Sequence, residues 1–248
     1  MSTPSIFVAT PCYGGQAFTT YVSSLLALQR ACIERNVPVH VELGGGDALI
    51  PRARGIMAAK FLERSDYSHL LFIDADMGFT PDQVFRLLDS GLDVVGGVYP
   101  AKKIDWAAAR RAWEKGTEDV AAASHPYVVR FLPSETNAVE VDNAGFGPVA
   151  YVGTGFLMIR RAALRRLTDA HPELRARHGD VTDAAMDEAV MLFETMIESD
   201  TGQYLSEDYA FCRRWRDLGG TIHADFTGRF THVGHMAHRG GLMDVAAR

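Results

Sequence analysis

The 248-residue sequence contains only three cysteines, Cys12, Cys32 and Cys212, and they are widely spaced. Disulfide-stabilised domains and cysteine-based zinc sites need more cysteines at closer, regular intervals, so the sequence indicates neither. Three scattered thiols are typical of a protein kept in a reducing compartment, and we therefore expect a cytoplasmic location.

Long hydrophobic runs and an excess of basic residues are also missing. No stretch reaches the roughly 18 to 20 apolar residues of a membrane span, and the N-terminus lacks a signal-peptide pattern. There are 25 Lys and Arg against 31 Asp and Glu, which gives a formal net charge of -6. General binders of nucleic acids or membrane surfaces need a basic face, so we expect neither function. An anionic substrate must then be held locally, by a metal ion or a few arginines.

The order of apolar patterns predicts an α/β fold. Short apolar runs typical of strands alternate with helical spacing as far as about residue 100, which is the rhythm of an open, mostly parallel sheet with helices on both faces. The remaining half favours short antiparallel strands. The predicted strands cover 5–10, 37–43, 70–73, 94–98, 127–132, 138–141, 149–152, 156–159, 191–197 and 221–224. With 47% hydrophobic residues and no internal repeat, residues 1–248 are expected to form one domain.

The strongest chemical signal is the segment from Ser68 to Phe79. Its apolar run, Leu70 to Ile73, is typical of a strand buried on both faces, and it ends at Asp74 and Asp76. Side chains two apart on an extended chain lie on the same side, so these carboxylates can converge on one cation. Carboxylate oxygens at this position suit Mg²⁺ or Mn²⁺ holding a substrate phosphate, although an acidic turn after a strand explains an isolated Asp-x-Asp equally well.

Four stretches in order resemble the GT-A glycosyltransferases, in particular the family 2 type of nucleotide-sugar transferases. They are Phe7–Tyr13, Phe72–Asp76, Ser206–Trp215 followed by Gly219–Gly220, and Thr231–Gly234. The resemblance spans most of the chain. It implies a GT-A fold, with residues 1–100 binding the nucleotide sugar and residues 101–248 binding the acceptor and ending in a metal-ligand tail.

The resemblance also implies roles at the metal. Asp76 would be the direct ligand of Mn²⁺ or Mg²⁺, Asp74 would lie near the metal or the ribose, and His232 would complete the metal shell. His235 and His238 lie nearby, but only His232 fits the pattern. A single histidine is also often structural.

Two acids, Glu207 and Asp208, begin a predicted helix that runs through Leu218. By resemblance, Asp208 is the general base that deprotonates an acceptor hydroxyl, with Glu207 beside it, and this role presumes inversion at the anomeric carbon. Capping of the helix is the alternative for these acids, and Ser206 is a further capping candidate.

The resemblance places Thr10, Pro11 and Tyr13 at the nucleotide base. Arg54 is a candidate for the diphosphate because arginine binds phosphate through a fork of donors. Other basic residues were weaker candidates, namely Arg52, Lys102 and Lys103. Relatives often carry an acid at the end of the second strand that recognises the base. Glu42 lies earlier in the predicted strand than that position.

Glycine and tryptophan suggest two further contacts. Gly153 and Gly155 flank Thr154 in a turn where a sugar can approach the backbone, or which is simply tight. Trp106 and Trp113 lie close to two helical turns apart; core packing is favoured over a sugar-stacking platform, and Trp215 is expected in the core.

These patterns predict a metal-dependent transferase that moves a sugar from a nucleotide-diphosphate donor to a sugar, glycan or other hydroxyl acceptor. Without membrane helices it should add single residues. One alternative is a non-catalytic sugar-nucleotide binder or degenerate transferase subunit. The other is a nucleotidyltransferase, although the loop after the first strand contains no lysine or arginine.

Overall fold

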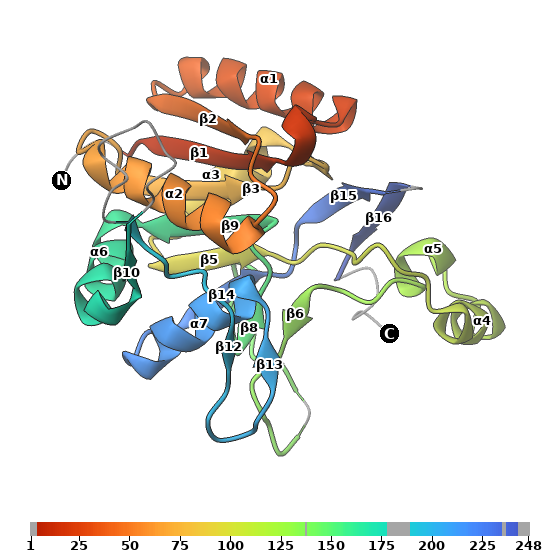
Figure 1. Cartoon of the computed structure of the whole chain (residues 1–248). Helices are drawn as coiled ribbons and strands as arrows, with labels where there is room; N and C mark the ends of the chain where they lie inside the picture. Colours follow the sequence, from red (N-terminus) through yellow and green to blue (C-terminus); the bar gives the residue numbers. More distant parts are fainter. Residues whose placement is uncertain (1–3, 137, 178–188, 235–236, 243–248) are drawn as a thin grey trace.

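The computed structural model describes residues 4–136, 138–177, 189–234 and 237–242. Its centre is a seven-stranded sheet in the order β2-β1-β3-β9-β5-β14-β7 (Figure 1). The strands are β1 (Ile6–Cys12), β2 (Val39–Gly45), β3 (His69–Ile73), β5 (Val94–Gly97), β7 (Phe146–Val149), β9 (Phe156–Arg160) and β14 (Ile222–Asp225). β1 pairs in parallel with β2 and β3, and β5 with β14, whereas β9 and β7 run antiparallel to their neighbours. The expected α/β class is confirmed, and the sheet is mixed, with three parallel and three antiparallel pairings.

Helices cover both faces of this sheet, because its strands are apolar on both sides. In β3, Leu70 and Phe72 belong to one core cluster, and Leu71 and Ile73 to the other, as side-chain alternation requires. Helices α1 and α3 pack on the second cluster, and α2, α6 and α7 on the first. The helices are α1 (Thr19–Glu34), α2 (Ile50–Glu63), α3 (Pro81–Asp89), α6 (Arg161–Ala170) and α7 (Glu207–Asp217).

Local signals placed the ends of α3 correctly. Thr80 is its N-cap residue, Pro81 is its first residue, and the Gln83 side chain accepts a hydrogen bond from the Thr80 amide at 2.7 Å. After the helix, Gly91 adopts a φ of +70°, in the left-handed region that glycine enters without strain.

The strand predictions in the second half were partly wrong. Residues 138–141 form no strand, the segment 127–132 contains only β6 (Val129–Arg130), and 191–197 contains only β12 (Met196–Ile197). β6 pairs with β8 (Tyr151–Val152), and β12 pairs with β13 (Tyr204–Leu205). The apolar, β-branched composition of these segments resembles that of strands, but Phe131, Leu132, Val139 and Val141 are exposed and lie outside the sheets.

The predicted surface excursion 171–187 is described only at its start. There β10 (Arg175–Ala176) pairs with β11 (Ala189–Val190), and residues 178–187 lie outside the described residues. Within the described parts of the chain, no helix combines the length and the apolar character needed to cross a bilayer.

The prediction that Trp106 and Trp113 pack in the core is wrong. Both lie on α4 (Trp106–Glu114), which precedes α5 (Val120–Ala123), and their side chains are 74% and 77% exposed. The residue that α4 buries is Ala112. Trp215 is buried in the core, as expected.

Candidate functional site

The candidate site lies where the parallel strands end. Asp74 and Asp76 follow β3 directly, and the loop after β1 lies beside them in a cleft of ≈ 350 Å³. Ligands of open α/β sheets bind at this edge. The cleft is lined by Pro11, Tyr13, Gln16, Phe18, Ile50, Arg54, Asp74, Ala75, Asp76 and Glu207.

A small antiparallel sheet brings His232 to Asp76. Its strands are β4 (Met77–Gly78), β15 (Arg229–Val233) and β16 (Ala237–Gly241), and His232 pairs with Met77 across β15 and β4. His232 Nε2 lies 3.5 Å from Asp76 Oδ1. The Lys102 ammonium contacts the other carboxylate oxygen of Asp76.

The proton on His232 is located by its second contact. Nδ1 lies 2.8 Å from the Pro100 carbonyl oxygen, which can only accept, so Nδ1 carries the hydrogen. The other nitrogen, Nε2, then faces Asp76 with its lone pair when the imidazole is neutral. An imidazole oriented by a carbonyl in this way is the usual arrangement of a metal-ligating histidine.

Asp76 and His232 fit a divalent cation, but the predicted three-ligand set is not assembled. Asp76 Oδ1 is buried and accepts no hydrogen bond from the described residues. Burial by itself raises the pKa of Asp76, yet His232 and Lys102 outweigh it, so the pKa lies below its ordinary value. Asp74 turns to Arg54 instead, and no cluster of three His, Cys, Asp or Glu arranged for a metal occurs among the described residues.

Arg54 connects the two acidic parts of the site. Its side chain, only 3% exposed, donates from Nη2 to Asp74 Oδ1 at 2.8 Å, and its Nε lies 3.6 Å from Glu207 Oε1. The guanidinium also lies over the Phe72 ring, at 5.4 Å. Burial lowers the pKa of Arg54, but the charges of Asp74 and Glu207 raise it further than burial lowers it. The two acids therefore share one buried, permanently charged partner.

Glu207 and Asp208 differ in their surroundings. Glu207 lines the cleft, and burial together with the charge of Asp208 raises its pKa. Asp208 Oδ1 accepts hydrogen bonds from the Ser206 hydroxyl and, at 2.8 Å, from the Tyr209 amide. Ser206 thus donates to Asp208 rather than capping α7. Oδ2 of Asp208 accepts no hydrogen bond among the described residues.

The predicted nucleotide-binding residues divide between cleft and core. Pro11 and the exposed Tyr13 line the cleft. Thr10 does not line the cleft: its side chain is fully buried, with its hydroxyl 2.6 Å from that of Tyr21, and its contact with the nucleotide stays a prediction. Of the weaker candidates, Arg52 pairs with Asp47.

Tyr99, which the sequence did not single out, is buried beside His232 and does not line the cleft. The Gly155 amide donates to its hydroxyl at 3.0 Å, and its ring packs edge-on against His232, with 5.3 Å between centroids. Burial raises the pKa of Tyr99 well above its usual value, and Asp74 and Asp208 add to this. No local pattern distinguishes this tyrosine from an ordinary strand residue.

Tyr99 also explains the paired glycines of the predicted turn. A Cβ at Gly153 would lie 2.2 Å from the Tyr99 hydroxyl, and one at Gly155 would lie 2.6 Å from it. The glycines therefore leave room for the tyrosine side chain, which approaches the backbone of this turn closely.

We predict that Tyr99→Phe lowers the free energy of unfolding by about 1–3 kcal/mol, because the Gly155 amide loses its acceptor while the ring remains in place. Urea unfolding measures the difference. The control is Tyr204→Phe, which removes an exposed hydroxyl and should change stability by less than about 0.5 kcal/mol. Equal losses in both variants would contradict the role given to the Tyr99 hydroxyl.

A buried carboxylate, Glu198, stabilises the region beside Asp208. It accepts hydrogen bonds from Thr201 at 2.6 Å, from Tyr151, and from Arg213 at 2.8 Å. Tyr151 in turn stacks on Tyr209, with ring centroids 4.9 Å apart. Led by Thr201 and Tyr151, these bonds lower the pKa of Glu198 to about 2 from its ordinary 4.5.

The pKa of Glu198 is lower in the folded than in the unfolded protein. The stability that the Glu198 carboxylate contributes is therefore fully present above about pH 4.5 and is lost as the pH falls toward 2. Between about pH 4.5 and 2 the free energy of unfolding of Glu198→Gln should therefore fall by about 2–3 kcal/mol less than that of the wild type. Chemical unfolding at several pH values measures it. The exposed Glu118→Gln should retain the wild-type pH profile, and an unchanged profile in Glu198→Gln would refute the prediction.

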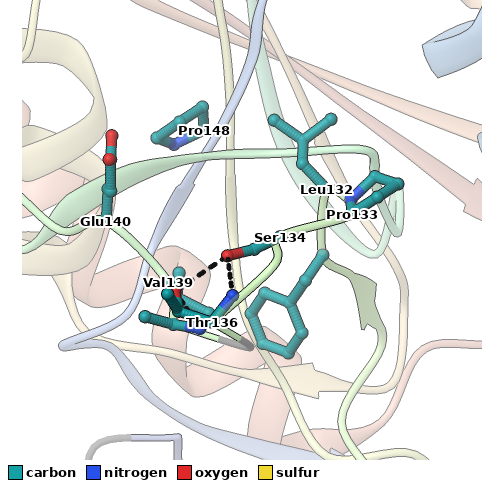
Figure 2. A pocket seen from close by; sticks show the side chains of 9 residues that line it. Leu132, Pro133, Ser134, Thr136, Val139, Glu140 and Pro148 are labelled. Atoms are coloured by element: carbon teal, nitrogen blue, oxygen red, sulfur yellow. Dashed lines mark hydrogen bonds between the residues drawn. The ribbon is translucent and has the colours of Figure 1, made fainter.

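A second cavity, of ≈ 280 Å³, shares no lining residue with the cleft (Figure 2). It is lined by residues 131–134, 136 and 138–140, together with Pro148 of β7. Its polar contacts are internal to the segment: the Ser134 and Thr136 hydroxyls lie 3.1 Å apart. Glu140 is its only ionisable lining residue among those described.

No protein-family model matches this sequence, and no curated protein is significantly similar to it. Solved structures resemble this chain, at low sequence identity. "A197 from STIV" is 17% identical, with a TM-score of 0.50, over 93% of this chain and 86% of that one. The catalytic domain of Drosophila β1,4-galactosyltransferase 7, in complex with xylobiose, is 14% identical, with a TM-score of 0.46, over 94% and 71%. A putative glucose-1-phosphate thymidylyltransferase from Bacillus anthracis is 10% identical, with a TM-score of 0.41, over 93% and 89%.

At these identities the likeness concerns the fold alone. The chain has an α/β fold with a mixed seven-stranded sheet, flanking helices and smaller antiparallel sheets. Activity has to be argued from the site itself.

Proposed function

We propose that the protein is a metal-dependent glycosyltransferase that moves a sugar from a nucleotide-diphosphate donor to an acceptor hydroxyl. The observation that carries this proposal is the meeting of Asp76 and His232 at the end of β3, beside a cleft walled by Asp74, Arg54 and Glu207. In this proposal residues 1–248 act as one domain, with the nucleotide sugar on residues 1–100 and the acceptor on 101–248.

Asp76 and His232 would hold Mn²⁺ or Mg²⁺, since a buried unsatisfied carboxylate oxygen and an oriented imidazole offer two ligands. When bound, such an ion acts as a Lewis acid that stabilises negative charge on the leaving diphosphate. Lys102 adds a fixed positive charge at the same carboxylate. Asp74, held by Arg54, would lie toward the ribose.

The donor base would lie against the loop after β1. Tyr13 is exposed in the cleft, where its ring can stack on a planar base, and Pro11 forms the adjoining wall. Arg54 lines the cleft and would contact the diphosphate through Nη1, which has no hydrogen-bond partner among the described residues, while Nη2 holds Asp74.

Transfer would proceed by direct attack of the acceptor oxygen. A bond forms between that oxygen and the anomeric carbon, while the bond from this carbon to the diphosphate oxygen breaks, leaving its electron pair on the diphosphate. Asp208 would take the acceptor proton on Oδ2, the oxygen without a hydrogen bond. Glu207 would lie beside Asp208 at the edge of the cleft, where burial and the charge of Asp208 raise its pKa.

Nucleotide release from a panel of UDP-, GDP- and dTDP-sugars, with and without Mn²⁺, tests the proposal. We expect metal-dependent release from one donor, accelerated by an acceptor. Binding without release in any condition would favour a non-catalytic sugar-nucleotide binder. Formation of a sugar nucleotide from a sugar phosphate and a nucleoside triphosphate would favour a nucleotidyltransferase.

A further inference from the structure

Residues 101–125 form a small helical module between β5 and β6, which contains α4 and α5. Hydrogen bonds close its base: the Ala101 amide donates to the Pro126 carbonyl at 2.8 Å, and the Asp105 amide to the Ser124 carbonyl at 2.7 Å. Figure 1 shows both helices projecting away from the central sheet.

The module exposes its largest apolar side chains and buries its smallest. Trp106 and Trp113 are 74% and 77% exposed, whereas Ala112 and Ala122 are buried between the helices. Seven residues correspond to about 10 Å along a helix and nearly two full turns, so both indoles lie on one face. A buried tryptophan contributes a large apolar area to a core. Trp106 and Trp113 are exposed, so they do not contribute to the core of this domain. Paired exposed aromatics mark an interaction surface.

The charge around this face differs from that of the chain. Although the net charge is -6, residues 102–115 contain five basic residues against two acidic ones, Asp105 and Glu114. Asp105 accepts from the Ala108 amide and so caps α4, and Glu114 pairs with Arg110 at 2.7 Å. The basic residues are Lys102, Lys103, Arg110, Arg111 and Lys115.

Two more acids follow this stretch in the module, Glu118 and Asp119. Asp119 accepts from the Ala122 amide at the start of α5 and lies 3.7 Å from Arg229 of β15, so a cation outside the module offsets it. Lys102 is likewise paired outside the module, with Asp76, so four basic side chains remain against three acidic ones and the module carries a small positive excess on an acidic protein.

We propose that the α4 face, defined by Trp106, Trp113 and the basic residues of 102–115, docks on an anionic phospholipid surface. Indole rings favour the boundary between headgroups and acyl chains, where the ring is desolvated and its N–H stays wet. Lys and Arg beside them are attracted to anionic headgroups over a Debye length. Lys102 places this face next to Asp76, so docking would bring the cleft near the membrane surface. The proposal does not depend on transferase activity.

Tryptophan fluorescence tests it directly. The chain has three tryptophans, and the third, Trp215, is buried in the core, so spectral changes report the α4 face. Vesicles of phosphatidylcholine mixed with phosphatidylglycerol should shift emission to shorter wavelengths and sediment the protein. Phosphatidylcholine alone should do neither, and about 1 M NaCl, with a Debye length near 3 Å, should release it.

Trp106→Ala with Trp113→Ala should weaken sedimentation on the order of tenfold or more, because binding scales with the buried apolar area. Arg111→Gln with Lys115→Gln should weaken it on the mixed vesicles. The matched control is Leu26→Ala with Ile33→Ala, two residues on α1 that are also seven apart and 61% and 78% exposed.

Three results would overturn the proposal. The first is equal sedimentation of the tryptophan variant and the control. The second is a spectral shift with soluble oligosaccharides but not with vesicles, which would make the face a glycan platform. The third is concentration-dependent self-association that the tryptophan variant abolishes, which would make it a contact between copies. No donor or metal enters these assays, so failure of the transferase proposal leaves them interpretable.

Discussion

Asp76→Asn is expected to lower metal-dependent nucleotide release by on the order of 10³-fold. Asparagine keeps the size of the side chain but removes the charge that His232 and Lys102 surround. A bound divalent ion contributes several kcal/mol to stabilisation of a leaving group, and each 1.36 kcal/mol is tenfold in rate. The measurement is the rate of nucleotide release at saturating donor, with Mn²⁺ varied.

A second readout separates metal binding from chemistry. Calorimetric titration with Mn²⁺ should show binding to the wild type and its loss in Asp76→Asn. His232→Gln should weaken binding less, because the carboxylate remains. The control is Asp169→Asn, an exposed acid at the end of α6. Unchanged Mn²⁺ dependence in Asp76→Asn would move the metal away from β3 and remove the basis of the proposed function.

The largest stability effect is expected for Arg54→Met. Methionine fills much of the volume of arginine but leaves Asp74 and Glu207 without their shared cation in a buried site. Breaking a buried pair by removing one partner typically costs about 3–5 kcal/mol, since the remaining charge is desolvated and unpaired. Urea unfolding at neutral pH measures this loss. Arg54→Lys should recover part of it, because the charge returns without the planar fork of donors.

Arg52→Met provides the matched control, two residues earlier on the same helix. Arg52 also pairs with a carboxylate, that of Asp47 at 2.8 Å, but its side chain is 44% exposed. Exposed pairs contribute at most about 1 kcal/mol, because water already solvates both charges. A similar loss of unfolding free energy in Arg54→Met and Arg52→Met would show that burial does not make the Arg54 ion pairs more stabilising than an exposed pair.

Local sequence determined the first half of the fold. β1, β2, β3 and β5, with α1, α2 and α3 between them, lie within a few residues of their predicted positions. Short apolar runs, helical spacing, and the Thr80–Pro81 start of α3 act over a few residues, so the chain itself displays them. The same local logic placed Asp74 and Asp76 at the carboxyl end of a buried strand.

Contacts between distant segments decided the rest. β9 inserts antiparallel between β3 and β5, and β15 carries His232 to Asp76 across more than half of the chain. Thr10, which is predicted to contact the nucleotide, is fully buried. Strand partners are chosen by the burial and hydrogen bonding of whole sheets, and a local pattern does not specify them.

The character of the site residues was decided in the same way. Whether a side chain is a ligand, a buried bridge or an exposed surface depends on what other segments place around it. Arg54 became a bridge because β3 and α7 bring Asp74 and Glu207 to it, and Tyr99 became a buried contact because the Gly153–Gly155 turn closes on its hydroxyl. The sequence by itself determined which chemical groups this protein has at the ends of its strands. Only the tertiary structure decided which of them meet, because proximity across the sheet is a property of the packed chain.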